Sequence, residues 1–464
     1  MKRYLVAAAV VAAFAVLPLA TAGASTQSSF HSRDGKILGM VPRTELHSQL
    51  TNQAPASGSL YYNGGPVMTQ NKAYTIFWQP SGYSFPSGYQ ANLNQFFKDL
   101  QAAQGSNTNT YDNATQYYQV NPNGSKSYVQ NKVTFEGTTL DTNPLPPLDP
   151  VNCPDTPGAA AGGAGGGQSA TAGCVTDSQV QQEISNVVKA NHWKVDSNTE
   201  FYMYTAPNIG TCFPAQVAEG GTQVGAPLCS FTYFCAYHSS YFDSTISGSQ
   251  IIYSNMPYDA QTSGSPLTCD VGDYPNGNPS DPEVSTTSHE QNESMTDPFG
   301  TGWWDSNSND SAAGDENGDM CAYDFGTTTG AANAEWDQTI NGHHYLMQLE
   351  WDNTTNGCPG SDASGNPTTH PNYDTPQIIL TPNIGYGGAL FKIIGQFFAA
   401  GDKVKSHFVD GTLHKTLNTT AVKVNPSGHF TQSAHVPAKA KAGTATVTSN
   451  GTSGQASNTF TVPS

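Results

Sequence analysis

The chain has 464 residues, of which 12% are charged, and its formal net charge is −18 at pH 7. This acidic balance excludes nucleic acid as a partner, because phosphate binding needs clustered Lys and Arg. Residues 23–374 contain 9 basic and 34 acidic side chains, whereas residues 375–464 contain 7 basic and 2 acidic ones. Two regions of opposite charge indicate two domains, which we place at residues 58–372 and 373–464.

The first 22 residues have the pattern of a secretory signal peptide. Basic residues precede an apolar run from Leu5 to Leu19, and Ala20-Thr21-Ala22 supplies the small residues of a cleavage site. The run is too short for a membrane anchor, and no second long apolar stretch follows. We therefore expect a secreted, extracellular protein without a membrane span. Residues 23–57 are polar and irregular, as in a leader or propeptide.

Eight cysteines follow the predicted cleavage site. An even number in an exported protein favours disulfides over a thiolate metal site, and the spacings match no zinc finger. The connectivity stays open on sequence alone. Pairing of neighbours in sequence would give Cys153–Cys174, Cys212–Cys229, Cys235–Cys269 and Cys321–Cys358.

The larger domain mixes strands and helices. Runs rich in β-branched and aromatic residues predict strands at 73–78, 200–205, 231–237 and 250–255. Apolar residues at helical spacing predict helices at 89–103 and 178–192. This mixture is typical of an α/β or α+β fold.

A further helix is predicted from Asp281 to Thr296. Ser280-Asp281-Pro282-Glu283 matches a capping box with Pro in the first turn, and Asp297-Pro298 marks the end of the helix. Few of its residues are strongly apolar, which is unusual for a core helix. We therefore expect the inner face of this helix to line a polar site.

The helix carries the motif Ser288-His289-Glu290-Gln291-Asn292-Glu293. His289 and Glu293 are four positions apart and share one face, so both can bind one metal ion. Glu290 is placed to act as the catalytic general base that takes a proton from metal-bound water. The alternative is that this His-Glu-x-x-Glu is a solvated helix face without a function.

A third metal ligand must come from elsewhere, because Glu293 replaces the second His of the familiar His-Glu-x-x-His zinc helix. Glu316 is the first choice and Asp319 the second, since both lie in a Gly-rich loop that a disulfide at Cys321 would hold. The remaining candidates for a third ligand are His238, His343 and His344. They stay open because one His among carboxylates is a hard ligand set for Zn²⁺ and would also suit Mn²⁺ or Ca²⁺.

A calcium loop is a second hypothesis for the segment from Asp305 to Glu316. Its acidic and amide residues have the spacing of an EF-hand loop, with Glu316 at the last position. However, Asp310 stands where the EF-hand needs Gly, and no helices are predicted on both sides. A plain polar loop is the alternative.

Seven motifs follow one another in the chain: Tyr61 to Met68, Thr75-Ile76-Phe77-Trp78, Cys235-Ala236-Tyr237-His238, Ser288 to Pro298, Trp304-Asp305, Glu316 to Cys321 and Gln348-Leu349-Glu350-Trp351-Asp352-Asn353. In this order they resemble secreted bacterial relatives of the EXORDIUM / phosphate-induced protein group, over residues 58–360. The resemblance implies an extracellular protein. The plant members of the group are growth-related proteins that lack the His-Glu-x-x-Glu motif.

The smaller domain consists of short alternating segments separated by turn residues. Such spacing without cysteines predicts an all-β immunoglobulin-like sandwich, resembling modules appended to bacterial secreted enzymes and surface proteins. Its positive charge would suit an anionic cell-wall polymer, and a simple spacer is the alternative. The predicted strands are 389–398, 403–409, 419–424, 429–435, 443–449 and 459–462.

Two functions of different class follow. One is a secreted, peptidase-like, zinc-dependent hydrolase with a zincin-like helix, which acts on an extracellular polypeptide or cell-wall polymer. The other is a non-catalytic adhesion or carbohydrate-binding protein, in which the carboxylates bind structural Ca²⁺ or nothing. Exposed aromatic residues such as Trp303 and Trp304 would then serve a sugar-binding surface.

Overall fold

The protein is described here from a computed structural model. Among the residues it describes, no helix is long and apolar enough to cross a membrane. The described residues are 40–42, 60–154, 173–213, 216–217, 223–224, 227–231, 234–246, 250–262, 269–305, 316–353, 357–360, 376–396, 398–399, 401–411, 413–424, 430–452 and 454–463.

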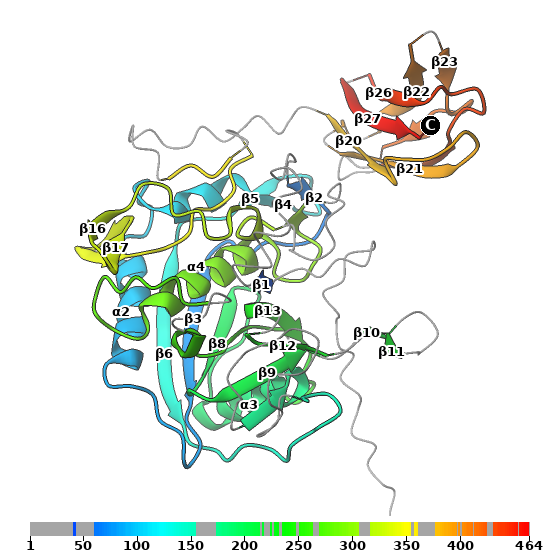
Figure 1. Ribbon diagram of the computed structural model, residues 1–464. Coiled ribbons are helices and arrows are strands. Elements are labelled where there is room, and N and C mark those ends of the chain that lie inside the picture. Colours follow the sequence, from blue (N-terminus) through cyan, green and yellow to red (C-terminus); the bar gives the residue numbers. More distant parts are fainter. Residues whose placement is uncertain are drawn as a thin grey trace, which may run out of the picture.

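A six-stranded mixed sheet forms the centre of the larger domain (Figure 1). Strands β14, β8, β3 and β6 run parallel, whereas β13 pairs with β14 and β1 pairs with β13 in antiparallel fashion. In spatial order the strands are β1 (Met40–Pro42), β13 (Phe234–Tyr241), β14 (Ile251–Met256), β8 (Thr199–Thr205), β3 (Asn71–Trp78) and β6 (Val133–Asp141).

Helices cover both faces of this sheet. Along β8, Tyr202 and Tyr204 belong to the core that includes α2 (Tyr89–Ala102) and α4 (Asp281–Thr296). The alternate residues of β8, such as Met203, pack with α3 (Asp177–Asn191) on the other face. Side chains that alternate along a strand thus serve two cores. The predicted helices and the four predicted strands of the domain are present, and the body is rich in β-structure with few helices.

Shorter elements surround the central sheet. Short 3-10 helices are η1 (Thr110–Gln116), η2 (Asp259–Thr262) and η3 (Asp319–Cys321). Short strands are β2 (Tyr61–Tyr62), β4 (Tyr118–Val120), β5 (Lys126–Tyr128), β7 (Gly173–Thr176), β9 (Ile209–Phe213), β10 (Gln216–Val217), β11 (Gln223–Val224), β12 (Leu228–Cys229), β15 (Trp303–Trp304), β16 (Thr329–Ala331), β17 (Ala334–Trp336), β18 (Gln338–Ile340) and β19 (His343–Tyr345).

The predicted capping box of α4 is wrong, although the helix has the predicted bounds. Ser280 occupies the N-cap position but makes no capping hydrogen bond. Its hydroxyl donates to Asn278 instead, and the Glu283 carboxylate accepts from the hydroxyl of Tyr89 and the backbone N–H of Asp259. Tertiary partners thus replace the local cap, because both side chains are buried in the packed body.

The predicted disulfide pairing is confirmed at all four bonds. They join Cys153 to Cys174, Cys212 to Cys229, Cys235 to Cys269 and Cys321 to Cys358. The third bond ties the start of β13 to the segment before α4, and the fourth closes the loop after η3. Four disulfides fit a protein of an oxidising, extracellular compartment.

One part of the predicted leader, residues 23–57, lies in the sheet. Residues Met40 to Pro42 form β1, which pairs with β13 at the sheet edge, with Met40 opposite Tyr237. Strand β1 also lies near α4 and η3. The leader therefore contributes backbone hydrogen bonds beside the strand that carries His238.

The smaller domain consists of two antiparallel sheets with a shared core (Figure 1). Phe391 from one sheet and Phe408 from the other both pack on Phe460. Strands β20 and β23 were not predicted, and the other six match predicted segments. One sheet contains β20 (Gln377–Thr381), β21 (Leu390–Gln396) and β25 (Phe430–His435); the other contains β22 (Lys403–Asp410), β23 (Leu413–Thr416), β24 (Val422–Lys423), β26 (Gly443–Asn450) and β27 (Gln455–Val462).

Candidate metal centre

Helix α4 is buried on all sides, which excludes the interpretation of its motif as a solvated helix face. All sixteen residues from Asp281 to Thr296 are buried, although most of them are polar. Its polar side chains find partners on several elements: Gln291 donates to Asn71 of β3, and Ser294 donates to Glu200 of β8. A polar helix in such a position needs partners for each buried group.

One group of possible metal ligands contains three of the predicted site residues. The Nε2 atom of His289 lies 2.9 Å from Oε1 of Glu293 and 3.5 Å from Oδ1 of Asp319. The ligand atoms of these three side chains lie within 4.8 Å of one another. The structure thus brings Asp319, the second choice for a third ligand, to the His289–Glu293 pair.

A second group contains Glu316, the first choice for a third ligand. It consists of His238, Glu293 and Glu316, and its ligand atoms also lie within 4.8 Å of one another. His238 comes from β13, where its Nδ1 atom lies 3.1 Å from Oε2 of Glu290 and 3.5 Å from Oε2 of Glu293. His238, one of three alternatives on sequence, therefore lies at the site.

The loop at η3 approaches α4 closely because it contains glycine. A Cβ atom added at Gly318 would lie only 2.9 Å from Cγ of His289 and 3.0 Å from Oε1 of Glu293. The backbone N–H of Asp319 donates to Oε1 of Glu293, and the side chain of Gln348 donates to the carbonyl of Gly318. These bonds hold the loop against the motif, and the Cys321–Cys358 disulfide closes the same segment.

Two further carboxyl groups, which were not predicted, lie beside these two groups of possible ligands. Asp297 accepts from the backbone N–H groups of Thr301 and Gly302. Burial raises its pKa to about 7, although the charge of nearby His238 acts to lower it. Glu350 is fully buried, and neither of its side-chain oxygens has a hydrogen-bond partner among the described residues. Their signals in the sequence were weak: Asp297 served only as a helix stop and Glu350 only as part of a family motif.

We name the whole set the carboxylate–histidine cluster. It combines six carboxyl groups with two imidazoles, each at most 3% exposed, and its described ion pairs all involve histidine. Buried carboxylates in excess of cationic partners are costly unless they bind protons or metal ions. The members are His238, His289, Glu290, Glu293, Asp297, Glu316, Asp319 and Glu350.

The pKa shifts indicate which side chains of the cluster bind protons most tightly. Burial opposes protonation of His238 and His289, but neighbouring carboxylates raise the pKa of both well above the ordinary value. Burial likewise opposes ionisation of Glu293, yet the two histidines lower its pKa to about 2. Burial raises the pKa of Glu290 to about 7 and that of Glu316 well above its ordinary value. Protons thus occupy the region where a cation would bind.

Other predicted features lie away from the cluster. His343 is half exposed and pairs with Asp99, while His344 stacks on Trp336. The prediction that exposed rings of Trp303 and Trp304 form a sugar-binding surface is wrong, because both residues are buried. The interior of the calcium-loop candidate, residues 306–315, lies outside the described residues.

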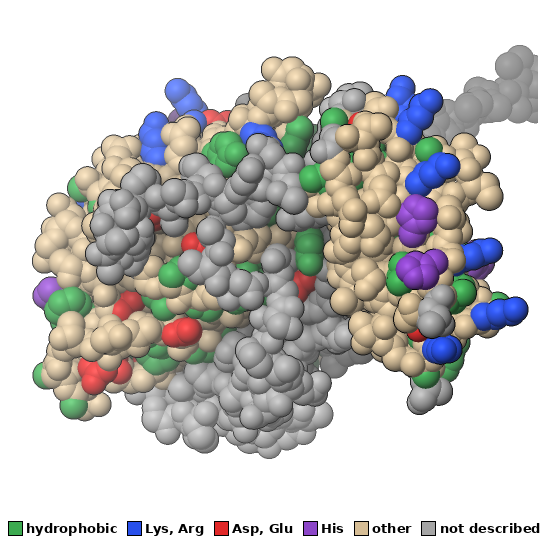
Figure 2. All heavy atoms as spheres, turned by 90° about the horizontal axis from the view of Figure 1, so that it is seen from above, with side chains coloured by type: hydrophobic (Ala, Val, Ile, Leu, Met, Phe, Trp, Pro, Cys, Tyr) green, Lys and Arg blue, Asp and Glu red, His purple; other side chains and the backbone are tan. Residues whose placement is uncertain are grey.

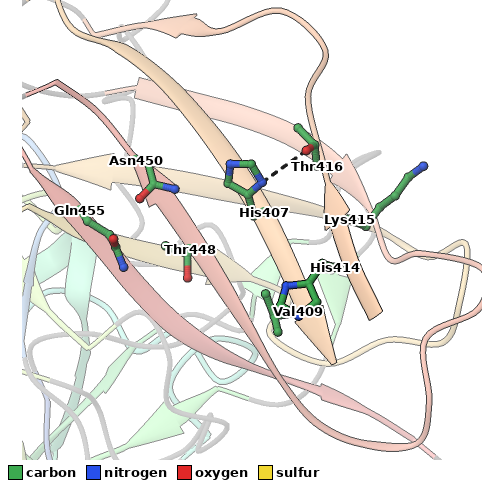
Figure 3. Close-up of a pocket in the computed structure, with 8 residues that line it drawn as sticks. All are labelled: His407, Val409, His414, Lys415, Thr416, Thr448, Asn450 and Gln455. Carbon is green, nitrogen blue, oxygen red and sulfur yellow. Dashed lines mark hydrogen bonds between the residues drawn. The ribbon is translucent and has the colours of Figure 1, made fainter. Parts of the chain in front are cut away.

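The smaller domain has a different surface. Lys and His side chains gather on it, as Figure 2 shows. A shallow hollow on the outer face of its larger sheet has a polar lining with basic side chains (Figure 3). The hydroxyl of Thr416 bonds to Nδ1 of His407 there. Among the described residues, no acidic side chain lines the hollow and none of the lining residues belongs to the carboxylate–histidine cluster. The lining residues are His407, Val409, His414, Lys415, Thr416, Thr448, Asn450 and Gln455.

Comparisons with known proteins identify no family for this chain. No family model matches the chain, and no curated protein does. Among solved structures, macromomycin is similar to 19% of this chain over 99% of its own length, with 15% sequence identity and a TM-score of 0.17. A likeness at this TM-score supports no statement about fold or function, which leaves the functional argument to the geometry of the cluster.

Proposed function

We propose that this chain is a secreted, peptidase-like, metal-dependent hydrolase. The observation that carries the proposal is the convergence of His289, Glu293 and Asp319, with Glu290 beside them on the same buried helix. One imidazole nitrogen and two carboxylates fit Zn²⁺, and the same set also suits Mn²⁺. The resemblance to the EXORDIUM group and to appended Ig-like modules supports an extracellular role.

Each side chain has a distinct task in this proposal. A bound Zn²⁺ would acidify a coordinated water molecule and so supply a nucleophile at neutral pH. Glu290 would take the proton, because Oε2 is held 3.1 Å from Nδ1 of His238 while Oε1 has no hydrogen-bond partner among the described residues. At a site with a single metal ion, His238 would orient the carboxylate of Glu290. The same carboxylate would then return the proton to the leaving group.

The test is hydrolysis of casein or gelatin by the zinc-loaded protein and by a Glu290→Gln variant. We expect the variant to keep its zinc and to lose activity by roughly 100-fold to 10,000-fold, the contribution of a general base. Glu136→Gln is the matched control, because Glu136 is exposed on β6 and the same chemical change there should have no effect. Equal activity of Glu290→Gln and the native protein would contradict the proposed role.

A non-catalytic extracellular protein with a structural metal is the second candidate. The burial of every member of the cluster favours it, since a structural ion needs no access for substrate. In that case the metal-loaded protein would hydrolyse neither substrate, and metal removal would lower the unfolding temperature. The Ig-like domain, with its basic surface, would then provide the contact with an anionic cell-wall polymer.

A further inference from the structure

Glu293 belongs to both groups of possible metal ligands. Its Oε1 atom faces His289, at 2.9 Å from Nε2, whereas its Oε2 atom faces His238, at 3.5 Å from Nδ1. The two triplets of possible ligands share no other residue. A carboxylate that presents one oxygen to each of two histidines has the arrangement of a ligand that bridges two metal ions.

The second triplet contains a carboxylate that the protein does not satisfy. Glu316 is fully buried, and neither Oε1 nor Oε2 has a hydrogen-bond partner among the described residues. Its Oε1 atom points toward His238, at 3.9 Å from Nε2. A buried carboxyl group without a hydrogen-bond partner destabilises the fold, and a bound cation would remove that cost.

His238 has the outer hydrogen bond expected of a metal-binding histidine. Its Nε2 atom lies 3.3 Å from the carbonyl oxygen of Asp297, which can accept the Nε2 proton. The lone pair of Nδ1 would then point toward Glu290 and Glu293. Such a bond to a backbone carbonyl fixes the tautomer and the ring orientation of metal-binding histidines.

We propose that His238, Glu293 and Glu316 bind a second divalent cation, so that Glu293 bridges a dinuclear centre. This inference rests on the proposed function, because the first ion is the one held by His289, Glu293 and Asp319. Two-metal sites stabilise both the attacking and the leaving oxygen in hydrolysis. The competing role for His238 is to orient Glu290 at a site with a single metal, and the two roles predict different metal contents.

The experiment counts Mn²⁺ and detects whether the ions interact. The mature protein is stripped with a chelator, reloaded with Mn²⁺ alone, and examined by elemental analysis and electron paramagnetic resonance. We expect two ions per chain and an exchange-coupled signal. His238→Ala and His289→Ala should each keep one ion with the signal of isolated Mn²⁺, and Glu293→Ala should weaken both sites. His343→Ala, at a half-exposed histidine outside the cluster, is the matched control.

Three results would overturn the dinuclear centre. One ion per native chain that persists in His238→Ala would leave the proposed hydrolase with a single metal. Two ions without coupling would show that Glu293 does not bridge them. No bound ion would remove both proposals together. If His238→Ala fails to fold by circular dichroism, Glu316→Gln replaces it, because the amide keeps the shape of the side chain and should also lose one ion.

Discussion

Helices α3 and α4 lie in the same domain and have similar lengths, but different interactions stabilise them. Helix α3 buries an apolar stripe that includes Val180 and Ile184, and Thr176 and Gln179 form a capping box at its start. Helix α4 has no side-chain capping bond at its N-terminus and is buried all round with a mostly polar surface. Local signals thus specify α3, whereas α4 depends on partners from distant segments.

The largest expected effect tests whether α3 is independent of the metal centre. Ile184→Ala removes a fully buried side chain from the core on the α3 face of the sheet, so we expect a loss of about 2 to 5 kcal/mol in unfolding free energy. Urea unfolding measures it, with and without Mn²⁺. Ile184→Val should cost only about 0.5 to 1.5 kcal/mol. A loss that changes with Mn²⁺ would show that the two helices are coupled.

The next effect concerns the close approach of η3 to α4. Gly318→Ala places a methyl group against the ring of His289 and the carboxylate of Glu293, both fully buried. We expect a loss of about 1 to 3 kcal/mol from overpacking, together with weaker Mn²⁺ binding by equilibrium dialysis. Gly360→Ala is the control, because no atom lies within 4 Å of a Cβ added there. Unchanged binding in Gly318→Ala would separate the loop from the metal site.

The bounds of both helices could be predicted from the sequence, despite this contrast. Periodicity located α3, and Pro and polar signals located α4 at its observed bounds, because these depend on residues close in sequence. The spacing of His289 and Glu293 likewise follows from helix geometry.

The remainder of the cluster depends on long-range packing. His238 reaches α4 because β13 lies in the sheet against that helix, and Glu350 arrives from a segment beyond η3. Sequence spacing could not decide that Asp319 joins His289 while Glu316 joins His238. That choice depends on the path of a loop held by tertiary hydrogen bonds.

A buried acid on α4 also makes the stability of the fold depend on pH. Burial raises the pKa of Glu283 to about 8 from an ordinary value of 4.5, and Asp259 lies beside it as a second buried acid. The folded protein therefore holds this proton more tightly than the unfolded chain does. The resulting stability is fully present below pH 4.5 and is lost as the pH rises toward 8.

Glu283→Gln should remove that loss, because the amide oxygen can still accept from Tyr89 and the group carries no charge. At pH 8 we expect the variant to exceed the native protein by on the order of 4 kcal/mol, and near pH 4.5 the difference should nearly vanish. Thermal unfolding at both values measures this. A variant that is less stable at every pH would mean that the carboxyl is ionised in the fold.

The smallest effect tests the local signal of α3. The Thr176 hydroxyl accepts from the backbone N–H of Gln179, while the Gln179 side chain accepts from the backbone N–H of Thr176. Thr176→Ala should therefore cost about 1 kcal/mol, and Thr176→Ser should restore most of it, because the serine hydroxyl can accept the same bond. Urea unfolding with chelator present provides the measurement. An equal loss in both variants would assign the effect to packing of the threonine methyl group, and α3 would then depend on tertiary contacts as α4 does.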